Sequence, residues 1–143
     1  MLAPNEHFLF VYGTLKQGYP NSDYLAHADF LGDFEVNCCK MAELPYAPAL
    51  VCYPSLTNEA RAAKVKGELY CVSAAHLRNI DKLEGHPHFY ERQQLCWINL
   101  VPGRHVCVFT YIYKHSIEKL PLITEWTKKP LARELLSYGS VPS

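Results

Sequence analysis

The sequence predicts a mostly antiparallel α+β fold in which about six strands pack with two or three helices. Short apolar or alternating runs recur along the chain, separated by turns that contain proline or glycine. Residues 74–84 carry apolar side chains at helical spacing. Two long β-rich runs flank Pro102, Gly103 and Arg104, which predicts an antiparallel hairpin. This mixture suits one α+β domain or a small barrel with flanking helices.

The composition bounds the class of protein. The 143 residues fit a single domain, residues 1–143, which is long enough to bury a sizeable core. Fourteen basic and fourteen acidic residues give no net charge, so no long-range electrostatic attraction to nucleic acid or to an acidic membrane is expected.

No apolar run approaches the roughly 20 residues that a membrane span needs, and residues 1–7 lack the pattern of a signal peptide. We expect a cytoplasmic protein with neither nucleic acid nor membrane as a partner. Nothing in the sequence marks an oligomer interface.

The cysteines are expected to be reduced. Four of the six lie inside apolar or alternating runs, where a free thiol behaves as a small buried hydrophobe, and two are adjacent in an extended segment. No Cys-x-x-Cys motif occurs. The six are Cys38, Cys39, Cys52, Cys71, Cys96 and Cys107.

In the first half of the chain, the expected elements are inferred from apolar runs and from the proline and capping residues that bound them. The aromatic and β-branched run at residues 8–12 indicates a buried strand. Asn21 or Ser22 could cap a short helix over residues 23–27. Prolines in and around the apolar stretch at residues 46–53 indicate an edge strand or irregular pairing, because proline cannot donate to a ladder. The remaining segments are an extended run at residues 28–41 and a polar loop at residues 55–63.

The second half contains clearer signals. Residues 65–72 alternate and predict a strand, with Gly67 at a point of close approach. Ser73 is expected to cap a helix from residue 74 to about residue 84, which Gly85 and Pro87 then end. The hairpin strands are expected at residues 90–101 and 105–114, and the tail contains a short helix at residues 131–136.

The end of the first strand is the first candidate for a site. Its apolar run stops abruptly at Gly13, which lets another group come close to the backbone and permits unusual angles. Consecutive amide groups in such a turn can form a concavity that attracts a carboxylate. The alternative is a plain strand-to-turn junction.

The second candidate is a carboxylate on the apolar side of the central helix. At about 100° per residue, Glu84 falls between Leu77 and Ile80, and Asp81 falls near the edge of that arc. Burial raises the pKa of a carboxyl, which suits general acid–base catalysis near neutral pH. The alternative is that Glu84 lies in a fraying last turn and reaches water.

The two stretches together resemble the γ-glutamylcyclotransferase-like family, and γ-glutamylamine cyclotransferases and small bacterial relatives look closest. The matching motifs run from Val11 to Gly18, from Leu83 to Gly85 and from Tyr90 to Arg92, with a closing strand at residues 108–113. The resemblance implies a small mixed, mostly antiparallel β-barrel with flanking helices. It also implies a transferase or lyase that releases 5-oxoproline from a γ-glutamyl amine or amino acid without metal or cofactor.

The resemblance also assigns roles to individual residues. Glu84 corresponds to the general acid/base. The substrate-binding positions are Tyr12, Gly13, Thr14, Leu15 and Tyr90, with Tyr111 and Tyr113 as further candidates for the pocket. Which γ-glutamyl compound is bound stays open.

Other classes remain as alternatives. One is a small-molecule binding module that keeps the pocket without the chemistry, and another is an amide-cleaving tailoring enzyme that uses the same glutamate. A metal site at His86 and His88 is disfavoured, because an extended His-Pro-His rarely places both rings on one ion. Cysteine–histidine catalysis is disfavoured because no cysteine lies at a helix start or a glycine-rich turn.

Overall fold

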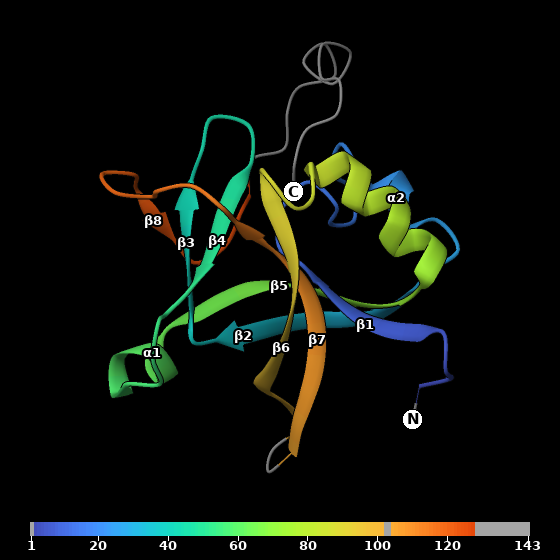
Figure 1. Ribbon diagram of the computed structural model, residues 1–143, viewed down its shortest axis with the longest axis horizontal. Helices are drawn as coiled ribbons and strands as arrows, with labels where there is room; N and C mark the ends of the chain where they lie inside the picture. The colour runs from blue at the N-terminus through green and yellow to red at the C-terminus, as the bar shows by residue number, and fades with distance from the viewer. Residues whose placement is uncertain (1, 102–103, 128–143) are drawn as a thin grey trace.

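Strands dominate the structure. The computed structural model describes residues 2–101 and 104–127, and these form eight strands, two α-helices and one 3-10 helix (Figure 1). In chain order they are β1 (Glu6–Val11), η1 (Ser22–Leu25), β2 (Asp29–Asn37), β3 (Cys39–Glu43), β4 (Pro48–Cys52), α1 (Asn58–Ala62), β5 (Lys64–Ser73), α2 (Ala74–Glu84), β6 (Tyr90–Val101), β7 (Arg104–Tyr113) and β8 (Leu122–Ile123). The predicted α+β class is confirmed.

The larger sheet has the strand order β2-β5-β1-β7-β6. Its neighbours are antiparallel except β1 and β7, which run parallel through Leu9 and Phe109. The outermost strands, β2 and β6, also come within contact distance, so the sheet curls. β1 lies at its centre, which explains why Leu9, Phe10 and Val11 are all buried. The predicted buried strand and the predicted hairpin are both confirmed.

The smaller sheet has the order β4-β3-β8. β4 is an edge strand, as its prolines predicted. β8 has only two residues, too few to show a strand pattern in the sequence. Figure 1 shows the start of β6 between this sheet and α2, and the hydroxyl of Tyr90 there donates to the carbonyl of Pro48 in β4 at 2.7 Å.

Two of the elements expected in the first half of the chain differ in the structure. The expected polar loop contains α1, whose cap, Thr57, accepts from the amide of Ala60 at 3.1 Å. Five residues are too few to show helical periodicity. The expected helix near residue 23 is the 3-10 turn η1, and Asn21 does not cap it with its side chain.

The central helix is confirmed with its caps. The hydroxyl of Ser73 accepts from the amide of His76 at 3.2 Å, and the amide of Ser73 donates to the His76 ring at 3.1 Å. Gly85 ends α2 with a left-handed φ of 67°, which glycine adopts without steric cost. The apolar face of α2, with Ile80 at its centre, packs against the larger sheet.

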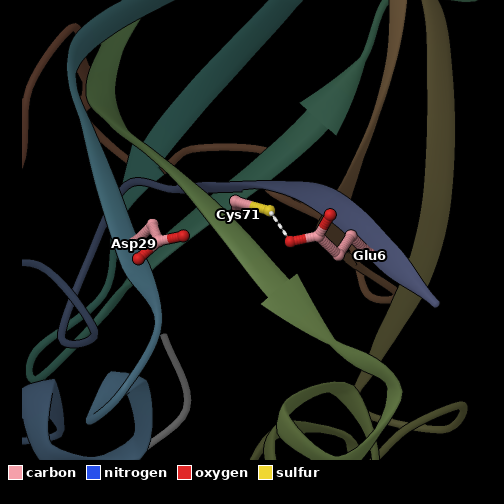
Figure 2. A group of neighbouring side chains, drawn as sticks. All are labelled: Glu6, Asp29 and Cys71. Atoms are coloured by element: carbon pink, nitrogen blue, oxygen red, sulfur yellow. Dashed lines mark hydrogen bonds between the residues drawn. The ribbon is translucent and has the colours of Figure 1, made fainter. Parts of the chain in front are cut away.

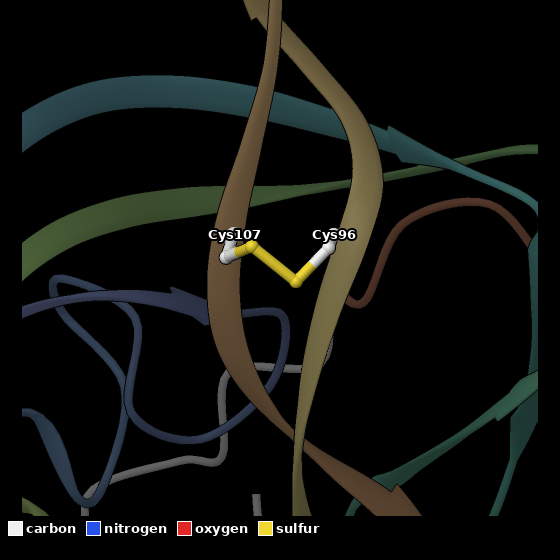
Figure 3. Close-up of a disulfide and its surroundings, with 2 residues drawn as sticks. All are labelled: Cys96 and Cys107. Atoms are coloured by element: carbon white, nitrogen blue, oxygen red, sulfur yellow. A yellow bond between two sulfur atoms is a disulfide. The ribbon is translucent and has the colours of Figure 1, made fainter.

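The expectation that all six cysteines are reduced is wrong for two of them. Cys96 and Cys107 form a disulfide between β6 and β7 (Figure 3). Leu95 pairs with Val108, so the next residues face each other with Cα atoms 4.0 Å apart. The sequence of each strand does not show which residue of the other strand lies opposite a given cysteine, so this pairing could not be predicted. The free thiols are Cys38, Cys39, Cys52 and Cys71, as expected.

The helix predicted at residues 131–136 lies outside the described residues. Within residues 2–101 and 104–127, no helix has the length and apolar character to cross a bilayer.

Candidate active site

Glu84 is the last residue of α2, and its side chain is fully buried at 0% exposure. The prediction that it lies on the apolar arc is confirmed, and the alternative that it reaches water is wrong. Gly85 turns the chain immediately after it, so the helix ends without exposing the carboxylate. A carboxylate held in this position must have a structural or chemical role, because burial of a charge is costly.

Three buried tyrosines, one just after a strand and two within strands, lie close enough to Glu84 to feel its charge. Tyr12 follows β1, Tyr90 begins β6 and Tyr111 lies in β7, and none is more than 1% exposed. Burial raises the pKa of each phenol well above its ordinary value, and the charge of Glu84 contributes to the rise in all three. All three rings are therefore within electrostatic reach of the carboxylate.

Each tyrosine hydroxyl is fixed by an acceptor. Tyr12 donates to the carbonyl of Tyr111 at 2.5 Å, and Tyr90 donates to the carbonyl of Pro48 at 2.7 Å. Tyr111 donates to Oδ1 of Asp81 at 2.6 Å. These bonds connect the end of β1, the small sheet, β7 and α2, so the walls of the site are held together through its tyrosines.

The loop after β1 is anchored by Asn21. The amide of Asn21 donates to the carbonyl of Thr14 at 2.9 Å, and its side-chain nitrogen donates to the hydroxyl of Thr14 at 2.9 Å. Thr14 and Leu15 are both buried. The glycine with a positive φ in this loop is Gly18, at 81°, so the unusual angles that Gly13 permits are not adopted at Gly13.

The loop after β1 is also held by hydrogen bonds to the carbonyl of Trp126. Lys16 donates from Nζ to the carbonyl of Trp126 at 2.5 Å and lies 4.6 Å from the centre of the Tyr19 ring. The hydroxyl of Tyr19 donates to the same carbonyl at 3.1 Å. The sequence analysis missed this anchor, because the backbone carbonyl of a residue 110 positions away leaves no signal in the sequence.

The structure brings most of the predicted site residues together. Leu15, Tyr90 and Tyr111 share one core cluster, which also contains Leu83 beside Glu84. Tyr113 lies farther out, where its ring packs 5.3 Å from Tyr90. Two residues that were not predicted as site residues also lie here, Asp81 and Arg92. Nε of Arg92 is 3.5 Å from Oδ1 of Asp81.

The histidines after α2 have a local role. Nδ1 of His86 accepts the backbone amide of Arg92 at 2.9 Å, which ties the end of α2 to β6. His88 is exposed. The ring of His86 therefore serves as a hydrogen-bond acceptor for the main chain.

One cluster has potential metal ligands within the part of the chain that the structure describes. Ligand atoms of Glu6, Asp29 and Cys71 lie within 4.8 Å of one another, on three adjacent strands (Figure 2). However, Cys71 donates to Glu6 at 3.4 Å, and the other oxygen of Glu6 accepts the amide of Ala3 at 2.8 Å. Burial and then Glu6 raise the pKa of the Cys71 thiol, which opposes the thiolate that a metal needs. This cluster is at the start of β1, away from Glu84.

The site is closed in this structure. Tyr12, Tyr90 and Glu84 are each 0% exposed, whereas the resemblance led us to expect a pocket at this place. A cavity of about 620 Å³ lies on a different face of α2, between η1 and the helix, and its lining includes Leu83 but not Glu84.

We predict that the buried tyrosines make the fold sensitive to alkali. Their folded-state pKa values are raised, so they stay protonated while tyrosines of the unfolded chain ionise near pH 10. The unfolded state then binds fewer protons. The stabilisation from these protonated tyrosines is present below about pH 10 and is lost as the pH rises, at a rate that approaches about 1.4 kcal/mol per pH unit for each tyrosine well above pH 10.

The check is the free energy of unfolding measured between pH 9 and 11. Tyr12→Phe should make its decline less steep by about 0.7 kcal/mol per pH unit on average over this range, because a tyrosine of the unfolded chain is only about half ionised at pH 10. Tyr46→Phe is the matched control, because Tyr46 is 62% exposed, and it should leave the slope unchanged. Equal slopes in wild type and Tyr12→Phe would contradict the prediction.

The fold and the site define a small α+β protein whose helix-end carboxylate is buried beside a strand-to-loop turn. A family model described as "Gamma-glutamyl cyclotransferase, AIG2-like" matches residues 9–128. The chain belongs to this AIG2-like gamma-glutamyl cyclotransferase family, which confirms the resemblance and supports an enzyme of gamma-glutamylcyclotransferase type.

Similar proteins come from distant organisms. A "Putative gamma-glutamylcyclotransferase" of Vibrio cholerae is 32% identical over 124 residues, covering 87% of this chain and 98% of its own. A protein of Methanocaldococcus jannaschii with the same designation is 31% identical over 110 residues, covering 76% of this chain and 86% of its own.

Solved structures show the same fold. An "aig2-like protein" from Mus musculus has a TM-score of 0.66 and 28% identity, and the match covers 86% of this chain and 89% of that one. The protein ytfP from Escherichia coli has a TM-score of 0.57 and 29% identity, and the match covers 89% of this chain and 98% of that one.

Proposed function

We propose that this protein is a γ-glutamyl cyclotransferase that releases 5-oxoproline from a γ-glutamyl amine or amino acid. The observation that carries the proposal is the burial of Glu84 at 0% exposure among three tyrosines beside the loop after β1. A Danio rerio relative named "Gamma-glutamylaminecyclotransferase C" is 33% identical over 93 residues, which supports this substrate class.

The reaction needs one group that moves a proton. The α-amine of the substrate attacks its own γ-carbonyl carbon, so an N–C bond forms and closes a five-membered lactam. The bond from that carbon to the leaving nitrogen then breaks. Glu84 takes a proton from the attacking amine and returns it to the leaving nitrogen, so the enzyme ends each cycle unchanged.

The loop from Gly13 to Leu15 would hold the substrate. Thr14 is fixed through its carbonyl and its hydroxyl by Asn21, so the loop backbone is pre-positioned. A rigid loop helps an intramolecular reaction, because the enzyme must mainly hold the bent conformer in which amine and carbonyl meet. Amides of this loop could bind the α-carboxylate or the oxygen on which charge develops. Tyr90 and Tyr111 would form the walls, and Tyr113 an outer layer.

Burial of Glu84 favours cyclisation over the alternatives. A hydrolase would need an attacking water beside Glu84, but the carboxylate is closed off from solvent. Internal attack needs no water, so a dry site suits it. A buried carboxylate costs stability, which favours a chemical role for Glu84 over a binding module without chemistry. Glu84 must become accessible when the substrate enters.

A product assay tests the proposal. The protein is incubated with a panel of γ-glutamyl amino acids, γ-glutamyl-lysine, γ-glutamyl polyamines and glutathione, and 5-oxoproline is measured by mass spectrometry. At least one compound should yield 5-oxoproline together with the matching free amine in equal amounts. Absence of 5-oxoproline from the whole panel would contradict the proposal.

A further inference from the structure

The hairpin of β3 and β4 carries two thiols that face each other. Cys39 begins β3, Cys52 ends β4, and the register of the two strands pairs them directly. The hairpin belongs to the smaller sheet, where its strands run side by side (Figure 1). Neither cysteine is in a disulfide in this structure. Such a pair can be oxidised if the backbone spacing suits a bridge and one thiol is reactive.

The hydrogen bonds of the hairpin show that the backbone spacing suits a bridge. The amide of Leu44 donates to the carbonyl of Ala47 at 3.0 Å, and the amide of Tyr53 donates to the carbonyl of Cys38 at 3.0 Å. Bonds in an antiparallel ladder occur at every second pair, so they skip the pair of opposed cysteines. Cα atoms at such a non-hydrogen-bonded pair lie about 4.5 Å apart. That distance is within the range of about 4.4 to 6.8 Å that disulfides usually span.

A comparable pair in the same chain is already bridged. Cys96 and Cys107 face each other on β6 and β7, with Cα atoms 4.0 Å apart, and form a disulfide (Figure 3). Directly opposed cysteines on neighbouring antiparallel strands therefore form a bridge in this fold.

The two thiols of the hairpin differ in reactivity. They share a hydrogen bond, which lowers the pKa of the Cys52 thiol, whereas this bond and then burial raise the pKa of the Cys39 thiol. Cys52 is half-buried, and Cys39 is only 1% exposed. The thiolate is the attacking form of cysteine, so Cys52 is the thiol that reacts first. Cys39, directly opposite, is placed to attack the product.

Space for a small reagent lies next to this pair. A cavity of about 600 Å³ is lined by Cys39 and by Tyr53, the residue after Cys52. Ile123 of β8 lies on its other side. A compound that enters this cavity therefore reaches the end of the hairpin that carries both thiols.

The other free thiols of residues 2–101 and 104–127 are less well placed. Cys38 is next to Cys39 in the chain, but it lies opposite Tyr53, and burial raises the pKa of its thiol. Cys71 lies on β5 in the larger sheet and donates to Glu6 at 3.4 Å. Cys38 is therefore the main competitor for Cys52.

We propose that Cys39 and Cys52 form a redox site that reacts with a small-molecule disulfide and closes to a cross-strand disulfide. The Cys52 thiolate attacks one sulfur of the reagent, which forms a mixed disulfide and releases one reagent thiolate. The Cys39 sulfur then attacks the Cys52 sulfur, and the second reagent thiolate leaves. Two electrons pass from the protein to the reagent, and the protons of both protein thiols end on the two released thiols. This site does not depend on the proposed function.

The test uses 2-hydroxyethyl disulfide, which carries no γ-glutamyl group. The folded protein is treated with it, remaining thiols are blocked with N-ethylmaleimide, and a tryptic digest is analysed by mass spectrometry. Cleavage after Lys40 separates residues 17–40, which contain Cys39, from residues 41–61, which contain Cys52. Wild type should give these two peptides joined by a disulfide, and dithiothreitol should separate them. The mixed disulfide at Cys52 should not accumulate.

Variants identify the partner of Cys52. Cys38→Ser is the matched control, one position from Cys39, and it should keep the joined peptides, which then can be linked only through Cys39. Cys39→Ser should lose the joined peptides and retain one 2-hydroxyethanethiol on Cys52. Cys52→Ser should lose them as well and leave Cys39 largely unmodified, because Cys39 is buried. Circular dichroism checks the fold of each variant.

Three results would overturn the proposal. The first is loss of the joined peptides in a folded Cys38→Ser protein, which would make Cys38 the partner. The second is a wild-type protein that keeps the mixed disulfide at Cys52 without forming the bridge. The third is a wild-type Cys52 that the reagent leaves unmodified. The wild-type and Cys38→Ser digests decide the question even if Cys39→Ser fails to fold.

Discussion

Glu84→Gln should lower kcat for 5-oxoproline release by at least about 100-fold, because general acid–base catalysis contributes roughly 10²- to 10⁴-fold. Glutamine has nearly the same shape as glutamate, and Glu84 is fully buried in a site walled by Tyr12, Tyr90 and Tyr111. The substitution keeps the packing and removes the group that accepts and returns the proton. KM should change little, since the loop after β1 makes the proposed binding contacts. Steady-state kinetics on the best substrate of the panel measures both constants.

Glu91→Gln is the matched control for this variant. Glu91 carries the same chemical group, but it lies on β6 with its side chain 34% exposed and paired with Lys114 at 3.4 Å. The control should retain the kcat of wild type. A Glu84→Gln protein that folds normally and keeps full activity would remove Glu84 from the mechanism. The same loss of kcat in both variants would also remove the special role of Glu84.

Gly67→Ala should be among the most destabilising single changes in the chain. A Cβ at this position would lie 2.3 Å from the carbonyl oxygen of Val11 and 2.7 Å from two ring carbons of Phe10. The backbone cannot yield without separating β1 from β5, which are hydrogen-bonded neighbours. We expect a loss of about 3 kcal/mol in the free energy of unfolding, or roughly 10 °C in Tm.

Lys66→Ala is the control on the same strand. Its side chain is exposed, so the loss should stay within about 0.5 kcal/mol. Thermal unfolding followed by circular dichroism compares the two variants. A Gly67→Ala protein as stable as Lys66→Ala would show that the close approach of β1 and β5 is not required. The result bears on the site, because Phe10 and Val11 lead directly into Tyr12 and Gly13.

The sequence predicted the features that depend on local pattern. The position of Glu84 on the apolar arc of α2 followed from helical spacing, and the caps Ser73 and Gly85 followed from their residue types. Gly67 was expected at a close approach because glycine is unfavourable inside a strand without such a reason. These inferences need only a few neighbouring residues.

Features that depend on register and long-range contact were not predictable. The disulfide between Cys96 and Cys107 requires the pairing of β6 with β7 at one particular register. The bond from Tyr111 to Asp81 joins residues 30 positions apart, so neither position shows it in the sequence. Asn21 or Ser22 was expected to cap a helix, but the side chain of Asn21 holds the hydroxyl of Thr14 instead. In each case the competing partner is provided by the tertiary structure.

The central claim is that the substrate's own amine, and not water, attacks the γ-carbonyl with Glu84 moving the proton. The most direct test is turnover of the best panel substrate in water enriched in oxygen-18, followed by mass spectrometry of the products. Internal attack predicts 5-oxoproline that carries no oxygen-18, together with the free amine. Glutamate carrying oxygen-18 as the initial product, with no 5-oxoproline, would show hydrolysis and contradict the account.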